Sequence, residues 1–293
     1  MSRSFAVLLL AVAAAIWGAT FPVVKGALQD ADPWTFLALR FGLAAALLVP
    51  ALRGRSSSGR GLGRAFVCGG ALFSGYVLQT WGLVSTTPAR SAFITALSVV
   101  LVPLLEPLAG MGRPTVRVWG GAALALGGLG VLLRPEAQPI TIGDLLTVGC
   151  AVAFAIHVLL LQWTARVMPA TRASAVQVLA TAALAIPAAA WQGQRLHLTP
   201  RLGGAVLVCA VLATVFAFWA MTAVQRVLTA AVTAVVLAFE PVAAAVVSLG
   251  LGEDRFSWSL VAGGAVVVAG VLLATVQRRA GGPVRATAAI PLG

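Results

Sequence analysis

The sequence predicts an all-α polytopic membrane protein with ten transmembrane helices, arranged as two inverted five-helix repeats. Three observations lead to this fold class. Of the 293 residues, 60% are hydrophobic and only 10% are charged, whereas a soluble domain carries roughly 25% charged residues. The apolar residues form long runs, and the basic residues gather in alternate connections between them. Motifs of the first half also recur in the second half.

Ten apolar runs are each long enough, at about 20 residues, to cross the hydrocarbon core as a helix. The connections between them are short and leave no room for a soluble domain. The first run resembles a signal peptide in position, but Trp17, Pro22 and Lys25 within it favour a retained helix. The predicted spans are residues 5–25, 33–52, 64–84, 90–110, 117–134, 143–163, 172–191, 202–224, 229–250 and 258–276.

The distribution of basic residues predicts the orientation. With the N-terminus placed inside, the inner segments carry 13 Arg and no acidic residue, whereas the outer segments carry six basic and six acidic residues. An excess of Lys and Arg marks the cytoplasmic side. We therefore expect a multi-pass protein of a bacterial-type cytoplasmic (inner) membrane with both termini cytoplasmic. The inner basic residues are Arg3, Arg53, Arg55, Arg60, Arg64, Arg113, Arg117, Arg166, Arg172, Arg226, Arg278, Arg279 and Arg285.

The two halves of the chain repeat one another. Five spans in each unit place the second copy upside down, and such inverted repeats are typical of carriers that open alternately to the two sides. We expect the first repeat over residues 5–134, the second over 143–276, and a polar, disordered cytoplasmic tail over 277–293. The matching segments are 95–97 with Pro103 and 233–235 with Pro241, and 130–133 with 270–273.

Several motifs resemble those of one transporter superfamily. Residues 17–21, Trp-Gly-Ala-Thr-Phe, together with Lys25, resemble the first-helix signature of the drug/metabolite transporters, and within them of the EamA-type ten-helix carriers. Leu39-Arg40-Phe41 is similar to the second-helix Arg of that family, and Gly252-Glu253 to its step into the last helix. The resemblance implies a ten-helix carrier that exports amino acids or other metabolites.

Ionisable side chains inside the spans need an explanation, because a charge there costs at least about 2.5–3.5 kcal/mol. Glu240, which precedes Pro241 in the middle of a predicted helix, is the sharpest candidate for a proton or substrate-amine site. The alternative is a structural carboxyl. Arg40 is expected either to neutralise Asp30 or Asp32, or to attract a carboxylate substrate.

Two further ionisable residues leave two interpretations each. His157 is a lone His in an apolar helix, which is typical of a structural residue, and a proton relay with Glu240 is the alternative. Glu106 lies near the inner end of its predicted helix. We expect it to reach the interface or to pair with a loop Arg.

Uncharged polar and aromatic residues complete the candidate site. Tyr76 and Gln79 are three residues apart and hence share one helical face. Trp17 and Trp219 lie deep in their predicted helices, as cavity wall or as packing, and Gln162 and Gln177 belong to the same polar set. The candidate substrate-binding or coupling residues are Trp17, Thr20, Arg40, Tyr76, Gln79, Thr95, His157, Trp219 and Glu240.

Small residues and prolines indicate packing and bending. The last helix of each predicted repeat is rich in Gly, which favours close helix–helix contact within the chain or between subunits. Prolines in or near the first, fourth and ninth helices favour kinks. The residues are Gly120, Gly121, Gly127, Gly128, Gly263, Gly264 and Gly270, and Pro22, Pro88, Pro103, Pro107 and Pro241.

Several function classes are excluded. The chain has no phosphate-binding loop ending in Lys-Ser/Thr, no nucleophile elbow and no zinc-protease motif. Cys68, Cys150 and Cys209 share no metal-ligand spacing. We therefore expect no enzyme activity, no catalytic residue, no metal and no cofactor. The net charge of +12 follows from the orientation signal, so no nucleic-acid partner is expected.

Together these features predict a secondary active transporter of small metabolites, amino acids or drugs that works by alternating access. Export follows from the family resemblance, and protons are one option for coupling. The expected partners are a small-molecule substrate and the lipid bilayer, and the oligomeric state stays open. A facilitated exchanger or channel is the nearest alternative. A membrane-embedded lipid-modifying enzyme is another, and it would need clustered catalytic residues at one interface.

Overall fold

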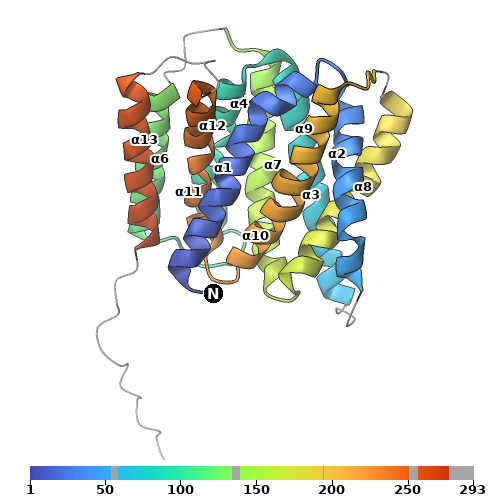
Figure 1. The fold of residues 1–293 in the computed structure, drawn as a ribbon. Helices are drawn as coiled ribbons and strands as arrows, with labels where there is room; N and C mark the ends of the chain where they lie inside the picture. Colours follow the sequence, from blue (N-terminus) through green and yellow to red (C-terminus); the bar gives the residue numbers. More distant parts are fainter. Residues whose placement is uncertain (54–58, 134–138, 194, 251–256, 277–293) are drawn as a thin grey trace, which may run out of the picture.

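The computed structural model describes residues 1–53, 59–133, 139–193, 195–250 and 257–276. Within these ranges the chain is almost entirely helical, with one isolated antiparallel bridge between Ala31 and Leu196. The helices stand side by side as a bundle (Figure 1). Nine described segments are long and apolar enough to cross a bilayer, and one shorter apolar helix, Val116–Leu132, accompanies them. The predicted all-α polytopic fold is confirmed.

Helices of the first half begin where a side chain can satisfy free backbone amides. Ser2, Asp32 and Thr87 each accept a hydrogen bond from the first turn of the helix that follows. The elements are α1 (Arg3–Ala27), α2 (Pro33–Leu48), a 3-10 turn η1 (Val49–Leu52), α3 (Gly59–Ser85), α4 (Pro88–Thr95), α5 (Ser98–Leu105) and α6 (Val116–Leu133).

The second half follows the same rule. Thr141, Thr199, Thr229 and Ser257 cap the helices that follow them. The elements are α7 (Ile142–Ala165), α8 (Ala170–Gln192), α9 (Pro200–Ala210), a π-helical turn η2 (Val211–Phe216), α10 (Ala217–Val224), α11 (Ala230–Leu237), α12 (Phe239–Gly250) and α13 (Trp258–Thr275).

Two predicted spans, 90–110 and 229–250, are not continuous helices. The second breaks at Ala238, between α11 and α12. Pro241 accounts for this break, because its ring excludes the carbonyl of the fourth residue before it, Leu237, where α11 ends. The first breaks at residues 96–97, between α4 and α5, where the backbone hydrogen bonds tighten to i→i+3. The polypeptide therefore interrupts both predicted spans within their length.

The end of the 90–110 segment also differs from the prediction. Helix α5 stops at Leu105, and Glu106 is its C-cap. The chain then turns through Gly110 and Gly112, whose φ angles of 67° and 105° suit glycine. The following helix, α6, starts at Val116.

Both ends of the described chain lie on one face of the bundle (Figure 1). Arg3 donates from Nε to the carbonyl of Thr275 at 3.1 Å, and Arg117 donates to the carbonyl of Val276 at 3.2 Å. The chain therefore crosses the bundle an even number of times. The predicted tail 277–293 and the Gly252-Glu253 motif lie outside the described residues.

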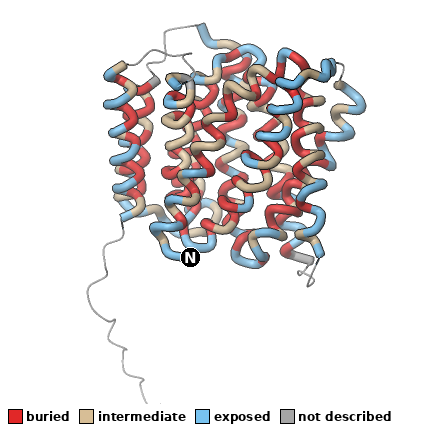
Figure 2. The backbone as a smooth tube through the Cα atoms, viewed as in Figure 1, coloured by how far each residue is buried: buried red, intermediate tan, exposed pale blue. Residues whose placement is uncertain are grey.

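Packing brings helices from the two halves together. Helix α6 packs along α13, α3 along α7 and α8, α2 along α8, and α1 along α12. Buried residues gather in the interior, and exposed residues cover the outer helices and the two ends (Figure 2). Large exposed apolar side chains such as Leu8, Leu145 and Leu272 face outward, as expected for a lipid-facing surface.

Candidate functional site

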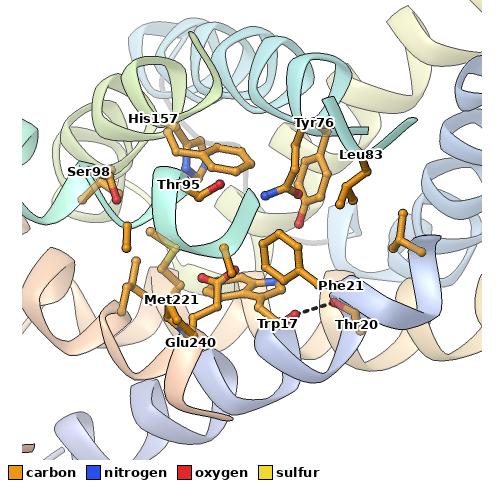
Figure 3. Close-up of a pocket in the computed structure, with 18 of the residues that line it drawn as sticks. Trp17, Thr20, Phe21, Tyr76, Leu83, Thr95, Ser98, His157, Met221 and Glu240 are labelled. Atoms are coloured by element: carbon orange, nitrogen blue, oxygen red, sulfur yellow. Dashed lines mark hydrogen bonds between the residues drawn. The ribbon is translucent and has the colours of Figure 1, made fainter. Parts of the chain in front are cut away.

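A cavity lies inside the bundle, lined by residues of α1, α2, α3, α4, α5, α7, α10, α11 and α12. It encloses about 780 Å³ that atoms do not fill, including space open to solvent. Its wall is mainly apolar and aromatic with a few polar groups, which is the usual make-up of small-molecule sites. Figure 3 shows Trp17 and Glu240 on one side of this cavity and Tyr76 and His157 on the other.

The cavity brings together most of the candidate residues from both halves of the sequence. These are Trp17, Thr20, Arg40, Tyr76, Gln79, Thr95, His157 and Glu240.

Trp219 stands apart from this group. It does not line the cavity, it is 36% exposed, and its ring lies 6.2 Å from that of Phe216. Its neighbour Phe218 lines the cavity instead. Successive residues on a helix point about 100° apart, so depth along a helix does not decide which of two neighbours faces inward.

Aromatic and apolar residues that the sequence analysis did not single out form much of the wall. Phe218 and Met221 are three residues apart on one face of α10, and Phe21 and Phe154 contribute from α1 and α7. The spacing of Phe218 and Met221 was the available signal, but the same spacing also marks ordinary packing.

Arg40 is held by neutral groups in the interior. It is 3% exposed, donates from Nε to Thr214 Oγ1 at 2.9 Å, and donates from one terminal nitrogen to the Tyr76 hydroxyl at 2.9 Å and to the carbonyl of Ala213 at 3.3 Å. Its guanidinium carbon lies 4.3 Å from the centre of the Tyr76 ring. Cation–π contact and hydrogen bonds thus replace part of the lost hydration.

The expected pairing of Arg40 with Asp30 or Asp32 is wrong. Both carboxylate oxygens of Asp30 accept hydrogen bonds from Arg201, at 2.8 Å each. Asp32 caps α2 and accepts from the amide of Trp34 at 2.9 Å. Among the residues that the structure describes, no acidic group lies within salt-bridge distance of Arg40. The charge of Arg40 is therefore available to the cavity.

The π-helical turn η2 supplies two of the three acceptors around Arg40. A π-turn widens the helix and displaces backbone carbonyls from their usual partners. The carbonyl of Ala213 accepts from both Trp17 Nε1, at 2.8 Å, and Arg40. The hydroxyl of Thr214 accepts from Arg40 as well. This turn thus joins α1 and α2 to the eighth predicted span at the cavity wall.

Glu240 reaches the cavity from the start of a helix. The sequence analysis placed it in the middle of a helix instead. It is the second residue of α12, directly after the break at Ala238, and it is half-buried. The broken backbone places the carboxyl group on the cavity wall next to Pro241.

Thr20, Thr95 and His157 on the wall each have a polar neighbour within the protein. The Thr20 hydroxyl donates to the carbonyl of Trp17 at 2.7 Å (Figure 3). Thr95 Oγ1 lies 4.0 Å from Cys150 Sγ. His157 is 2% exposed and its Nε2 lies 2.8 Å from Gln177 Oε1. His157 therefore bonds to α8, and not directly to Glu240.

The end of the bundle that holds both chain ends is closed beneath the cavity. Glu106 is only 4% exposed, and its carboxylate faces the backbone amides of Ala230 and Ala231 at the start of α11, with the charge of Arg166 nearby. Gln162 Oε1 accepts from the Ala230 amide at 2.8 Å. The expectation that Glu106 reaches the interface is wrong, because it is buried between the first and second halves of the chain.

The cavity extends toward the opposite face. Val24 and Leu83, near the C-terminal ends of α1 and α3, and Ala92 of α4 line it. Lys25 donates from Nζ to carbonyls at the end of α3, among them Leu83 and Thr86. A cation at a helix C-terminus satisfies free carbonyls and complements the helix dipole. This contact fixes the end of α1 against α3 at the rim.

Comparison with known proteins agrees with this architecture. The model of the EamA-like transporter family matches residues 4–134 and again residues 141–276. A protein of Archaeoglobus fulgidus, described as an uncharacterized transporter, is 31% identical over 242 residues, which cover 83% of this chain and 76% of that protein. One crystal structure superposes with a TM-score of 0.77 at 23% identity, over 94% of this chain and 97% of the other, which shows a shared fold. This multi-pass membrane protein belongs to the EamA-like transporter family.

Proposed function

We propose that this protein is a secondary active transporter of small metabolites that works by alternating access, with the central cavity as its substrate site. One observation carries the proposal. Arg40 from the first half and Glu240 from the second half line one cavity that is packed shut at one end and extends toward the other. Intramembrane charges of this kind mark substrate and ion pathways.

The arrangement of the helices supports alternating access. We propose that residues 5–134 and 143–276 are inverted repeats, and the two matches to one family model, at 4–134 and 141–276, support this division. The broken helices α4–α5 and α11–α12 occupy corresponding places in the two halves. Discontinuous helices at the binding site are common in carriers built this way.

The charges of the cavity suggest the substrate class. A guanidinium binds a carboxylate well, since it offers several donors in a fixed plane. A carboxylate such as Glu240 binds an ammonium group or a proton. We propose that amino acids and related metabolites bind between Arg40 and Glu240, and that Glu240 exchanges a proton during the cycle.

The direction and the compartment follow from charge and family. We propose that the protein lies in a cytoplasmic (inner) membrane with both termini cytoplasmic, since 13 Arg and no acidic residue fall in the segments that the sequence places on the side of the termini. The cavity then opens outward in this state. We propose export as the physiological direction.

Flux measured in proteoliposomes tests the proposal. We expect saturable uptake of at least one member of a radiolabelled panel of amino acids, nucleosides and organic cations, accelerated by a pH gradient. Glu240→Gln abolishes the response to the gradient, whereas Trp219→Leu, outside the cavity, preserves flux. Unitary conductance without saturation would indicate a channel. Chemical modification of the lipid would indicate an enzyme, and flux that does not respond to pH would indicate a facilitated exchanger.

A further inference from the structure

We infer that Gln177 fixes the tautomer of His157, so that His157 presents an unprotonated Nδ1 to the cavity and selects substrates that bring a hydrogen-bond donor to it. This inference rests on the proposed function, because it describes how the same cavity distinguishes its substrates. It assigns a positioning role to Gln177, which lies on α8 and outside the cavity wall.

The contact between the two side chains is buried and short. Gln177 is 0% exposed and His157 is 2% exposed. Gln177 Oε1 lies 2.8 Å from His157 Nε2. At this depth there is little water to replace a lost partner, so breaking this hydrogen bond is costly. The bond is therefore a fixed part of the structure.

A chain of hydrogen bonds determines which end of the Gln177 amide faces His157. The hydroxyl of Thr222 donates to the carbonyl of Phe218 at 2.6 Å, so its remaining capacity is to accept. Gln177 Nε2 fills that role, donating to Thr222 Oγ1 at 3.3 Å. The Gln177 oxygen is then turned toward His157.

The position of the Cys68 thiol agrees with this orientation. The thiol is 0% exposed, and its Sγ lies 3.6 Å from Gln177 Oε1 and 3.9 Å from the carbonyl oxygen of His157. A thiol is a weak donor and favours an oxygen over an amide NH₂ group. Since Gln177 Oε1 only accepts, the partner nitrogen of His157, Nε2, carries the proton.

The state of Nε2 decides the state of Nδ1. A neutral imidazole has one N–H donor and one acceptor nitrogen, and the bond at one nitrogen selects the tautomer. The two nitrogens lie on different sides of the ring, so Nδ1 points away from Gln177. His157 lines the cavity, and no hydrogen bond to Nδ1 occurs within the described residues.

The ring of His157 is also held in place. Phe218, another wall residue, meets it edge-on with ring centres 5.8 Å apart and planes at 87°. The acceptor at Nδ1 is therefore oriented before substrate arrives. A preorganised acceptor increases the affinity for a ligand that carries an O–H or N–H donor, and it lowers the affinity for an analogue of the same shape without that donor.

The inference assigns three recognition elements to one cavity. Arg40 binds a negative group, Glu240 a positive group or proton, and His157 Nδ1 a neutral donor elsewhere on the substrate. In this arrangement His157 accepts a hydrogen bond and does not carry the coupled proton, so the relay between His157 and Glu240 is not needed.

Nitrogen NMR tests the tautomer without any transport measurement. The sequence contains two His, His157 and His197, so ¹⁵N-His labelling of the full-length protein in nanodiscs gives two sets of signals, and His197→Gln identifies those of His157. At about pH 7 a His is usually neutral and a Cys thiol is usually protonated. Under these conditions we expect a protonated Nε2 and an unprotonated Nδ1 in His157. A protonated Nδ1, or an imidazolium, would overturn the inference.

Two variants test the cause. Thr222→Val removes the acceptor for the Gln177 amide, and Gln177→Leu removes the bond to His157, so both should mix the tautomers of His157. Thr164→Val is the matched control, because the Thr164 hydroxyl also donates to a carbonyl four residues earlier, at 2.9 Å, but does not contact Gln177. Unchanged spectra in Gln177→Leu would contradict the positioning role.

Ligand stabilisation tests the selectivity with isosteric probes. Threonine and valine have the same shape, and threonine carries the additional O–H donor. We expect threonine to bind about tenfold more tightly than valine, the value of one good hydrogen bond, and Gln177→Leu to reduce this ratio to near one. Equal affinities in the wild-type protein would overturn the selectivity. The tautomer result stands apart from these assays, so a failure of the proposed function is recognised separately.

Discussion

Gly128 of α6 and Gly263 of α13 bring two helix backbones into direct contact. A Cβ atom at Gly128 would lie 2.7 Å from the carbonyl oxygen of Gly263, and one at Gly263 would lie 2.5 Å from that of Gly128. Gly121 and Gly270 repeat the relationship two turns away, at 2.5 and 2.6 Å. These glycines pack within the chain, which resolves the choice left open by the sequence.

The same Gly→Ala substitution is expected to have opposite effects on stability at two adjacent positions of α6. Gly128→Ala forces the helices apart, and we expect it to lower the free energy of unfolding by about 1–3 kcal/mol. Gly127→Ala is the control, since a Cβ there meets nothing within 4 Å, and it should be neutral or stabilising by about 0.5–1 kcal/mol. Thermal unfolding in one detergent measures both. Equal Tm values for the two variants would contradict the close contact.

Arg40 depends on the shape of its guanidinium as well as on its charge. Arg40→Lys keeps the charge but cannot reach Thr214, Tyr76 and the Ala213 carbonyl together, because an ammonium is a compact donor. We expect kcat/KM for the transported substrate to fall by at least about tenfold, the effect of about 1.4 kcal/mol. Tyr76→Phe removes one partner and should cost less. Retention of full transport by Arg40→Lys would contradict this role.

Glu106 is expected to stabilise the closed form of the end of the bundle that holds both chain termini. Glu106→Gln removes the charge that faces the α11 amides, so states open at the face of the chain ends should become more populated. A cysteine replacing Ser98, a wall residue, reports this as faster reaction with an impermeant thiol reagent from that face. Arg113→Gln, which changes an exposed Arg in the connection between α5 and α6, is the control. No increase over this control would contradict the role of Glu106.

Asp30 makes the stability of the protein depend on pH in the acidic range. The hydrogen bonds from Arg201, with further help from Thr199, lower the pKa of Asp30 from 3.8 to about 2. A carboxyl whose pKa is lower in the folded state stabilises the fold above its unfolded pKa, and this contribution is lost as the pH falls through the folded pKa. We expect Tm to fall between about pH 5 and pH 2, and the fall to be smaller in Asp30→Asn. Parallel curves for the two proteins would exclude this contribution.

Local signals in the sequence predicted the spans and many of their ends. Apolar run length determines where a helix crosses, and caps such as Asp32 and Thr229 act within four residues. Pro241 predicted a kink near Glu240. The structure instead ends one helix before Ala238 and starts a new one after it. Proline disfavours a continuous helix without dictating how the chain resumes.

The partners within the site depended on tertiary packing. The sequence analysis expected Asp30 as a partner of Arg40. The actual acceptors lie in the π-turn at residues 211–216, and no local sequence pattern predicts such a turn. Trp219 and Phe218 could not be told apart, because which side of a helix faces inward depends on its neighbours. The sequence analysis placed Gln177 in the polar set of the predicted helices, but its bond to His157 joins residues on different helices.

Arg40, which has no acidic partner among the described residues, also makes the proposed cycle sensitive to membrane voltage. With Glu240 protonated the cavity carries one net positive charge, and with Glu240 ionised it carries none. An elementary charge that crosses the whole membrane potential changes energy by about 2.3 kcal/mol per 100 mV. In the proposed alternating access the site moves relative to that field. The membrane potential should therefore shift the equilibrium between the two open states of the empty carrier when Glu240 is protonated, and hardly at all when Glu240 is ionised.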